Sequence, residues 1–152
     1  VMTGWDQIQI VKDEFGKPYL KNNKSHISFS HSGNFAAAML NIDDPIGVDI
    51  QEIREKILHI APKFISEKEY EYLEPSTQVK AIHIIWGAKE AMFKKHGKGE
   101  VLFKEHIFVH PFNLEDEGEI VVTFSKAGYE ETCTFKYLFY ENYCLVYSAC
   151  HL

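Results

Sequence analysis

Hydrophobic residues recur with two different periods along this chain, and the changes between them divide it into three parts. Up to about residue 50, short stretches alternate polar and apolar residues, which predicts β-strands. Between about residues 55 and 96 the apolar residues recur at helical spacing, and from Val101 the alternation returns. The connections in this last part are too short for crossovers, so its strands are expected to be antiparallel. The pattern predicts an α+β fold, with a helical middle packed on an antiparallel sheet.

The predicted strands are short, and polar turns separate them. One further segment, 35–40 (FAAAML), fits a buried strand as well as a short helix, because periodicity alone does not separate the two. The turn that follows it, 41–45, is rich in Asn, Asp and Pro, which favour turns. The predicted strands are 7–12, 26–30, 46–50, 106–112, 119–124, 132–139 and 143–149.

Three helices are predicted in the middle of the chain. Ser66 and Glu69 stand three residues apart in the pattern of a capping box, which marks the start of the second helix. Pro75 interrupts the pattern after it, and Gly97 ends the third and longest helix. The predicted ranges are 55–64, 66–73 and 77–96.

Length, composition and charge exclude some classes of protein but do not indicate a function. The 152 residues suit one compact domain or two small subdomains that share a core. A net charge of −6 argues against a general nucleic-acid binder, and no apolar run is long enough for a membrane span. The first residues lack the basic and apolar blocks of a secretion signal, and the three cysteines form no C-x-x-C pair. We therefore expect reduced thiols and a cytoplasmic protein.

Asp49 is the first residue that suggests chemistry, because it interrupts an apolar strand, 46–50. A carboxylate in such a strand is costly to bury without a partner, so it either lies in water at a strand end or holds a cation. Gln51 shares its face by the two-residue period of a strand, whereas Glu52 points the other way. From the strand alone, a structural or turn-capping role for Asp49 stays open beside the role of a metal ligand.

Glu90 is the second candidate, on the longest predicted helix. It lies four residues before Lys94, so the two side chains share one side of the helix and form a favourable ion pair. A solvated stripe of charge explains that spacing as well as a functional site does. In the segment Ser28 to Gly33, His31 between serines offers hydroxyl, imidazole and backbone N–H groups to an anionic oxygen. No nucleophile elbow, P-loop or H-E-x-x-H motif is present.

Taken together, five short motifs resemble those of the Sfp-type 4′-phosphopantetheinyl transferases. Each motif is weak alone, but all five occur in the family's order with compatible spacing, and the strands after them fit the family's C-terminal sheet. The motifs lie at 16–20 (GKPYL), 27–33 (ISFSHSG), 47–51 (GVDIQ), 64–70 (FISEKEY) and 86–94 (WGAKEAMFK).

The resemblance implies a reaction and a set of roles. Members of this family move the phosphopantetheine arm of coenzyme A onto a serine of an acyl or peptidyl carrier protein, with Mg²⁺ as the metal. The resemblance makes Asp49 and Glu90 the Mg²⁺ ligands, and it gives Lys94 a place at the pyrophosphate, where it stabilises the leaving 3′,5′-ADP. Glu90, or a water that it holds, is expected to accept the serine proton. Contacts with coenzyme A are expected from Lys17, His31, Glu69, Lys89 and Lys94.

The sequence departs from the family pattern in two ways. Gln51 stands where the family usually has a second acid, so we expect a metal site with two protein carboxylates, to which the Gln51 amide adds an uncharged ligand. The region 1–45 corresponds only to the end of the family's N-terminal subdomain, whereas 46–152 corresponds to a complete C-terminal subdomain. A coenzyme A-binding module without transfer activity, because half of its cleft is missing, therefore stays open as the alternative, and so does a domain used only for interactions.

Overall fold

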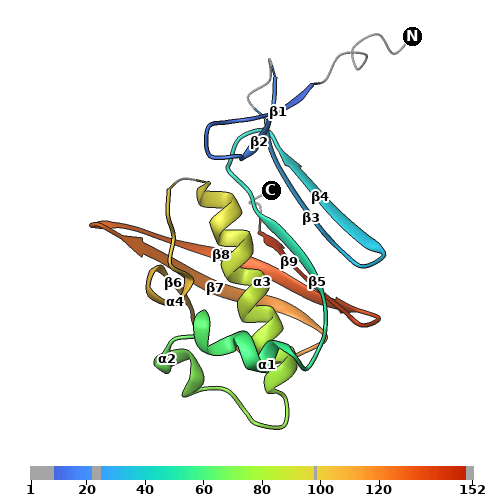
Figure 1. Cartoon of the computed structure of the whole chain (residues 1–152), viewed down its shortest axis with the longest axis vertical. Helices are drawn as coiled ribbons and strands as arrows, with labels where there is room; N and C mark the ends of the chain where they lie inside the picture. Colours follow the sequence, from blue (N-terminus) through green and yellow to red (C-terminus); the bar gives the residue numbers. More distant parts are fainter. Residues whose placement is uncertain (1–8, 22–24, 98, 150–152) are drawn as a thin grey trace.

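The structure, a computed structural model, describes residues 9–21, 25–97 and 99–149. Two antiparallel sheets and one long helix make up most of it (Figure 1). The helix crosses one face of the larger sheet, and the smaller sheet stands beside the edge of the larger one. The predicted α+β class, with an antiparallel sheet packed against a long helix, is confirmed.

The larger sheet has the strand order β5-β9-β8-β7-β6. Its last four strands in sequence form the predicted meander, and β5 joins that meander at the edge next to β9. The predicted strand 106–112 is wrong at both ends. A helical turn, α4 (Phe103–His106), precedes it, and Pro111 lacks the N–H that would continue the ladder. The bounds are β5 Val48–Glu52, β6 Ile107–Val109, β7 Glu117–Lys126, β8 Tyr129–Tyr140 and β9 Tyr143–Ser148.

Local signals set the bounds of the helices. The predicted capping box is present at α2, where Ser66 and Glu69 exchange side chain–backbone hydrogen bonds. The predicted helix 55–64 is instead α1 followed by a 3₁₀ turn, η1, because Pro62 has no N–H to continue α1. The longest helix, α3, ends as predicted at Gly97, whose φ is 67°. The bounds are α1 Ile57–Ile60, η1 Ala61–Lys63, α2 Glu67–Tyr70 and α3 Gln78–His96.

Helix α3 lies at the centre of the core. Ile82, Ile84 and Ile85 are fully buried although they point in different directions, because the sheet covers one side of α3 and the α1–η1 segment another. Trp86 packs its ring against Phe64 of that segment. Burying one such apolar side chain contributes about 1.5–3 kcal/mol, so these contacts fix α3 firmly against the sheet.

The smaller sheet has the order β1-β2-β3-β4, and the ambiguous segment 35–40 is one of its strands. Phe35 at the start of β4 packs against Tyr140 and Tyr143 of the larger sheet. The predicted strand 7–12 is described only from residue 9 onward. The change from one sheet to the other falls near residue 45, and the division into subdomains 1–45 and 46–152 stays a prediction. The bounds are β1 Ile10–Lys12, β2 Pro18–Leu20, β3 His26–Ser32 and β4 Phe35–Asn41.

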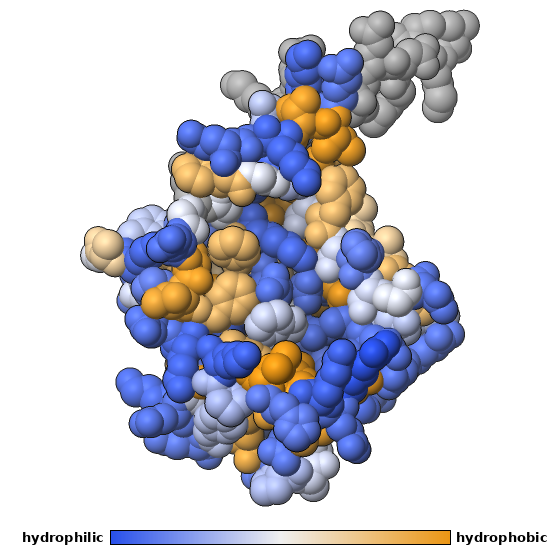
Figure 2. Space-filling view, in the orientation of Figure 1, coloured by the Kyte–Doolittle hydropathy of each residue, from blue (hydrophilic) through white to orange (hydrophobic). Residues whose placement is uncertain are grey.

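Apolar surface is unevenly distributed. Figure 2 shows apolar surface near the top of the view, over the smaller sheet. Ile10 in β1 and Ile42, just after β4, are 56% and 67% exposed. Within the described residues no helix is both long and apolar enough to cross a membrane. Cys144 is a buried free thiol and Cys133 a half-buried one, whereas Cys150 lies outside the described residues.

Candidate active site

Asp49 lies on β5 with only 7% of its surface exposed. Its Oδ1 accepts hydrogen bonds from Lys94 Nζ at 2.8 Å and from Ser30 Oγ at 2.9 Å. Burial raises the pKa of Asp49, although the charge of Lys94 and the bonds from Lys94 and Ser30 act in the opposite direction. The carboxylate is therefore held in place, and Lys94 and Ser30 offset only part of the cost of burying its charge.

Two glycines allow β5 to approach α3 closely. A Cβ at Gly47 would overlap the backbone carbonyl of Ala91, so only glycine permits this contact. A Cβ at Gly87 would lie 3.2 Å from the Gln51 amide nitrogen and closer still to Val146. The contact brings the Asp49 strand against the helix turn that carries Glu90.

Glu90 and Lys94 occupy the side of α3 that faces Asp49. Lys94 Nζ donates to the Val48 carbonyl at 2.9 Å as well as to Asp49. The pKa of Glu90 is raised, first by desolvation and second by the negative charge of Asp49, while Lys94 lowers it. The structure thus brings together the three charged residues that were expected to meet.

Gln51 lies on the same side of β5 as Asp49, as the strand period predicts. Its Nε2 donates to the His83 carbonyl at 3.0 Å and lies 3.4 Å from Asp49 Oδ2. Because a carbonyl only accepts, the amide nitrogen must face His83. Ligation of a metal by the amide oxygen of Gln51 stays a prediction.

The oxygen atoms of Asp49 and Glu90 are of the kind that a hard divalent cation prefers. Asp49 and Glu90 both have raised pKa values, and each carries charge that burial leaves poorly solvated, which a cation would offset. Mg²⁺ prefers one or two carboxylates and completes its shell with phosphate and water. The described part of the chain holds no cluster of three or more His, Cys, Asp or Glu residues suited to a metal.

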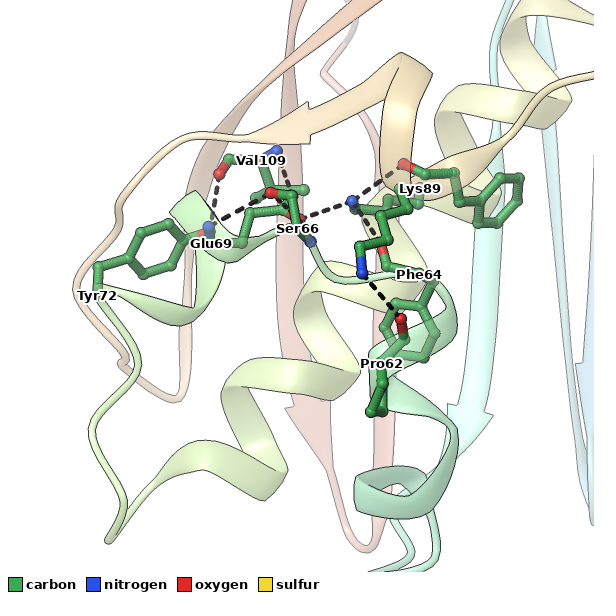
Figure 3. Close-up of polar contacts among 9 residues, drawn as sticks. Pro62, Phe64, Ser66, Glu69, Tyr72, Lys89 and Val109 are labelled. Atoms are coloured by element: carbon green, nitrogen blue, oxygen red, sulfur yellow. Dashed lines mark hydrogen bonds and ion pairs between the residues drawn. The ribbon is translucent and has the colours of Figure 1, made fainter.

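Glu69 and Lys89 form a separate ion pair, drawn in Figure 3. Lys89 Nζ donates to Glu69 Oε2 at 2.8 Å and to the carbonyls of Phe64 and Phe103 at 2.7 and 3.1 Å. Both charged side chains are 0% exposed. Although Lys89 directly precedes Glu90, it points to another side of α3, since successive helical residues diverge by about 100°. Direct contact with coenzyme A, expected for both residues, would require this pair to open, and it stays a prediction.

Lys17 and His31, the other expected phosphate contacts, lie apart from Asp49. Lys17 Nζ donates to the Lys95 carbonyl at 2.8 Å, at the C-terminal end of α3. His31 is exposed on the face of β3 opposite to Ser30, because successive strand residues alternate between faces. Lys17 thus places its ammonium group at the end of α3, whereas His31 faces away from Ser30, and the contacts of both residues with phosphate stay predictions.

Two hollows flank the charged group. A cavity of about 300 Å³ lies between the smaller sheet and the end of α3, with Lys17, Phe29, Phe93 and Lys94 in its wall. A second hollow, of about 590 Å³, has Glu90 in its wall beside Trp86 and Phe103. Lys94 lines the first hollow and Glu90 the second, and the two residues are one helical turn apart.

Ser30 also belongs to this site, although the sequence did not predict its contact with Asp49. Its hydroxyl contacts Asp49, although 19 residues separate the two. The signal that could have found it is the alternation of Ser28, Ser30 and Ser32, which places three hydroxyls on one face of a strand.

Comparison with known proteins places the chain in a family. Residues 45–148 match the model of the 4′-phosphopantetheinyl transferase superfamily. A 4′-phosphopantetheinyl transferase of Bacillus subtilis is 31% identical over 142 residues, which are 91% of this chain and 61% of that protein. The Sfp transferase of Bacillus subtilis strain 168 is 32% identical over 76% of this chain and 51% of its own length. The psf-1 transferase of Bacillus pumilus is 37% identical over 62% of this chain and 42% of its own length.

The chain thus spans about half the length of the curated relatives that it matches. The matched region contains β5 and α3, the two elements that carry Asp49 and Glu90. The resemblance that the five sequence motifs indicated is confirmed, and the chain belongs to the 4′-phosphopantetheinyl transferase superfamily.

Proposed function

We propose that this protein transfers the 4′-phosphopantetheine group of coenzyme A to a serine of an apo acyl or peptidyl carrier protein. The observation that carries the proposal is the meeting of Asp49, Glu90 and Lys94 where β5 contacts α3. Two carboxylates and one lysine between two hollows suit a pyrophosphate that must be held by a metal ion and a cation. A cytoplasmic location fits a protein with free thiols.

In the proposed reaction the carrier serine Oγ attacks the β-phosphorus of coenzyme A. A new P–O bond forms to the carrier, the pyrophosphate P–O bond breaks, and 3′,5′-ADP leaves with the bridging oxygen. The serine proton passes to Glu90 or to a water that it holds. Lys94 stabilises the negative charge on the leaving phosphate.

Mg²⁺ held by Asp49 and Glu90 would supply further stabilisation of the phosphoryl oxygens. Gln51 adds an amide to that site without adding charge. Lys17 and His31 contact the phosphates of coenzyme A from the smaller sheet, and the 300 Å³ cavity beside Lys17 accepts part of the nucleotide. Glu69 and Lys89 would contact coenzyme A only after their buried ion pair opens.

A mass measurement tests the proposal. The chain is incubated with coenzyme A, Mg²⁺ and an apo carrier protein, and the carrier is then weighed by intact mass spectrometry. We expect a gain of one phosphopantetheine arm with the wild type and none with Glu90→Ala or Asp49→Ala, provided that circular dichroism shows both variants folded. Turnover at the wild-type rate in either variant would contradict the metal site.

The alternative is a coenzyme A-binding module without transfer. It predicts Mg²⁺-dependent binding of coenzyme A with no gain in carrier mass.

A further inference from the structure

Three serines of β3 take the place of a neighbouring strand along one edge of β5. β5 pairs with β9 through backbone hydrogen bonds on its other edge. On the edge facing β3, the N–H groups of Val48, Ile50 and Glu52 each donate to a serine hydroxyl at 3.1 Å. The acceptors are Ser28, Ser30 and Ser32, in that order. This serine ladder joins the smaller sheet to the strand that carries Asp49.

Ser30 differs from the other two serines, because its Oγ also lies 2.9 Å from Asp49 Oδ1. A hydroxyl has one proton and two lone pairs. The N–H of Ile50 uses a lone pair of Ser30, so the proton is left for an acceptor. The Asp49 carboxylate is closer than the competing Ile50 carbonyl at 3.5 Å, and its charge strengthens the bond.

The bond fixes one oxygen of Asp49 and leaves the other available. Oδ1 is held by Ser30 and Lys94, whereas among the described residues Oδ2 has only the 3.4 Å contact of the Gln51 amide. With two donors on one oxygen, the carboxylate cannot rotate without breaking charge-assisted bonds. The orientation of the Asp49 carboxylate is therefore set by β3 as well as by α3.

We infer that Ser30 is a positioning residue that orients the Asp49 carboxylate for a divalent cation, and that the serine ladder makes this orientation depend on β3. The inference rests on the proposed function, because it takes Asp49 as a metal ligand. Residues that hydrogen-bond to metal ligands raise metal affinity about 10–100-fold. Ser32 provides the matched control, since it makes the same bond to the backbone of β5 but lies beyond Asp49.

The test is a titration with Mn²⁺ alone, followed by water-proton relaxation, with unfolding temperatures measured in parallel. We expect Ser30→Ala to weaken Mn²⁺ binding about tenfold or more, and Ser32→Ala to leave it within about twofold. Both variants lose one backbone partner and should lower the unfolding temperature, Ser30→Ala by more because it also loses the bond to Asp49. Ser30→Thr keeps the hydroxyl and should restore wild-type Mn²⁺ affinity.

The outcomes separate the inference from the proposed function. Equal weakening of Mn²⁺ binding by Ser30→Ala and Ser32→Ala, or none by either, would overturn the inference and leave the metal site intact. If Asp49→Asn binds Mn²⁺ as tightly as the wild type does, both the inference and the proposed metal site are overturned. If Ser30→Ala does not fold, Ser30→Cys keeps the shape with a weaker donor and should show the same loss of Mn²⁺ affinity. Normal affinity in Ser30→Cys would count against the inference.

Discussion

At the scale of single residues, the site is a place where ionisation is unfavourable until a cation is bound. The pKa of Glu90 lies above its ordinary value of 4.5, first because of desolvation and then because of Asp49. A native state with a raised carboxyl pKa binds the proton more tightly than the unfolded chain does. The free energy of unfolding therefore falls as pH rises from 4.5 through the raised pKa, and this loss of stability is complete above that pKa.

Glu90→Gln removes that loss of stability together with the metal ligand. We expect the variant to unfold at a higher temperature than the wild type at neutral pH in the presence of a chelator. The difference should vanish as the pH falls below 4.5, where Glu90 is protonated in both states. Mg²⁺ should raise the unfolding temperature of the wild type and not that of the variant. A variant less stable than the wild type at every pH would show that the charge of Glu90 stabilises the fold.

The buried pair of Glu69 and Lys89 calls for a different experiment, because both groups are fully enclosed. Burial lowers the pKa of Lys89, and the charge of Glu69 acts against that shift. Lys89→Met leaves the Glu69 carboxylate without a counter-charge, and we expect it to cost about 3–5 kcal/mol in denaturant unfolding. Adding Glu69→Gln should recover only part of that loss, since it removes the buried charge but leaves one of the N–H groups of Ser66 and Val109 without an acceptor.

Coenzyme A binding by that double variant then separates two roles of the pair. Unchanged affinity would mean that Glu69 and Lys89 only hold η1, α2 and α3 together. A tenfold or larger loss in a stable double variant would support the predicted contact with coenzyme A.

At the scale of elements, the contact between β5 and α3 depends on Gly47. Gly47→Ala would force the strand and the Ala91 carbonyl apart, so we expect a loss of more than about 3 kcal/mol in stability and weaker Mg²⁺ binding. Gly128→Ala is the control. Its φ is +82°, and no atom lies within 4 Å of the added Cβ. It should cost only about 1–2 kcal/mol and leave Mg²⁺ affinity unchanged. Equal effects of the two substitutions would show that the close contact does not position the site.

The elements that the sequence predicts well are those with local signals. The capping box at Ser66, the glycine that ends α3 and the alternation in β7 to β9 are each visible within a few residues. Periodicity left 35–40 open between strand and helix, and the pairing of β4 with β3 decides it. The α4 turn has no local signal of this kind. It forms with His106 Nδ1 accepting from the Leu102 N–H at 2.9 Å.

In the site, too, the residues with local signals could be predicted from the sequence and the tertiary contacts could not. Asp49 stands out in the sequence because an acid in an apolar strand needs a partner, and the spacing of Glu90 and Lys94 places both on one side of a helix. The contact of Ser30 with Asp49 is tertiary: the alternation of serines shows that their hydroxyls share one face of a strand, but not which strand they contact. The enclosure of Lys89 likewise depends on carbonyls from η1 and α4, so its direction could not be read from the motif.

At the scale of the whole molecule, the site is assembled from both sheets and the helix between them. The smaller sheet contributes Ser30 and Lys17, the larger sheet Asp49, and α3 contributes Glu90 and Lys94. The net charge of −6 does not prevent anion binding, because Lys17 and Lys94 both line the 300 Å³ cavity. Binding of coenzyme A should therefore depend on a local charge balance, which a divalent cation completes.

Calorimetric titration of the chain with coenzyme A, in Mg²⁺ and in a chelator, tests that claim most directly. We expect Mg²⁺ to strengthen binding by about tenfold or more in the wild type, and to change it by less than about twofold in Asp49→Asn and in Glu90→Gln. Wild-type affinity that is the same in Mg²⁺ and in chelator would contradict the account, because Asp49 and Glu90 would then not share a cation at the pyrophosphate.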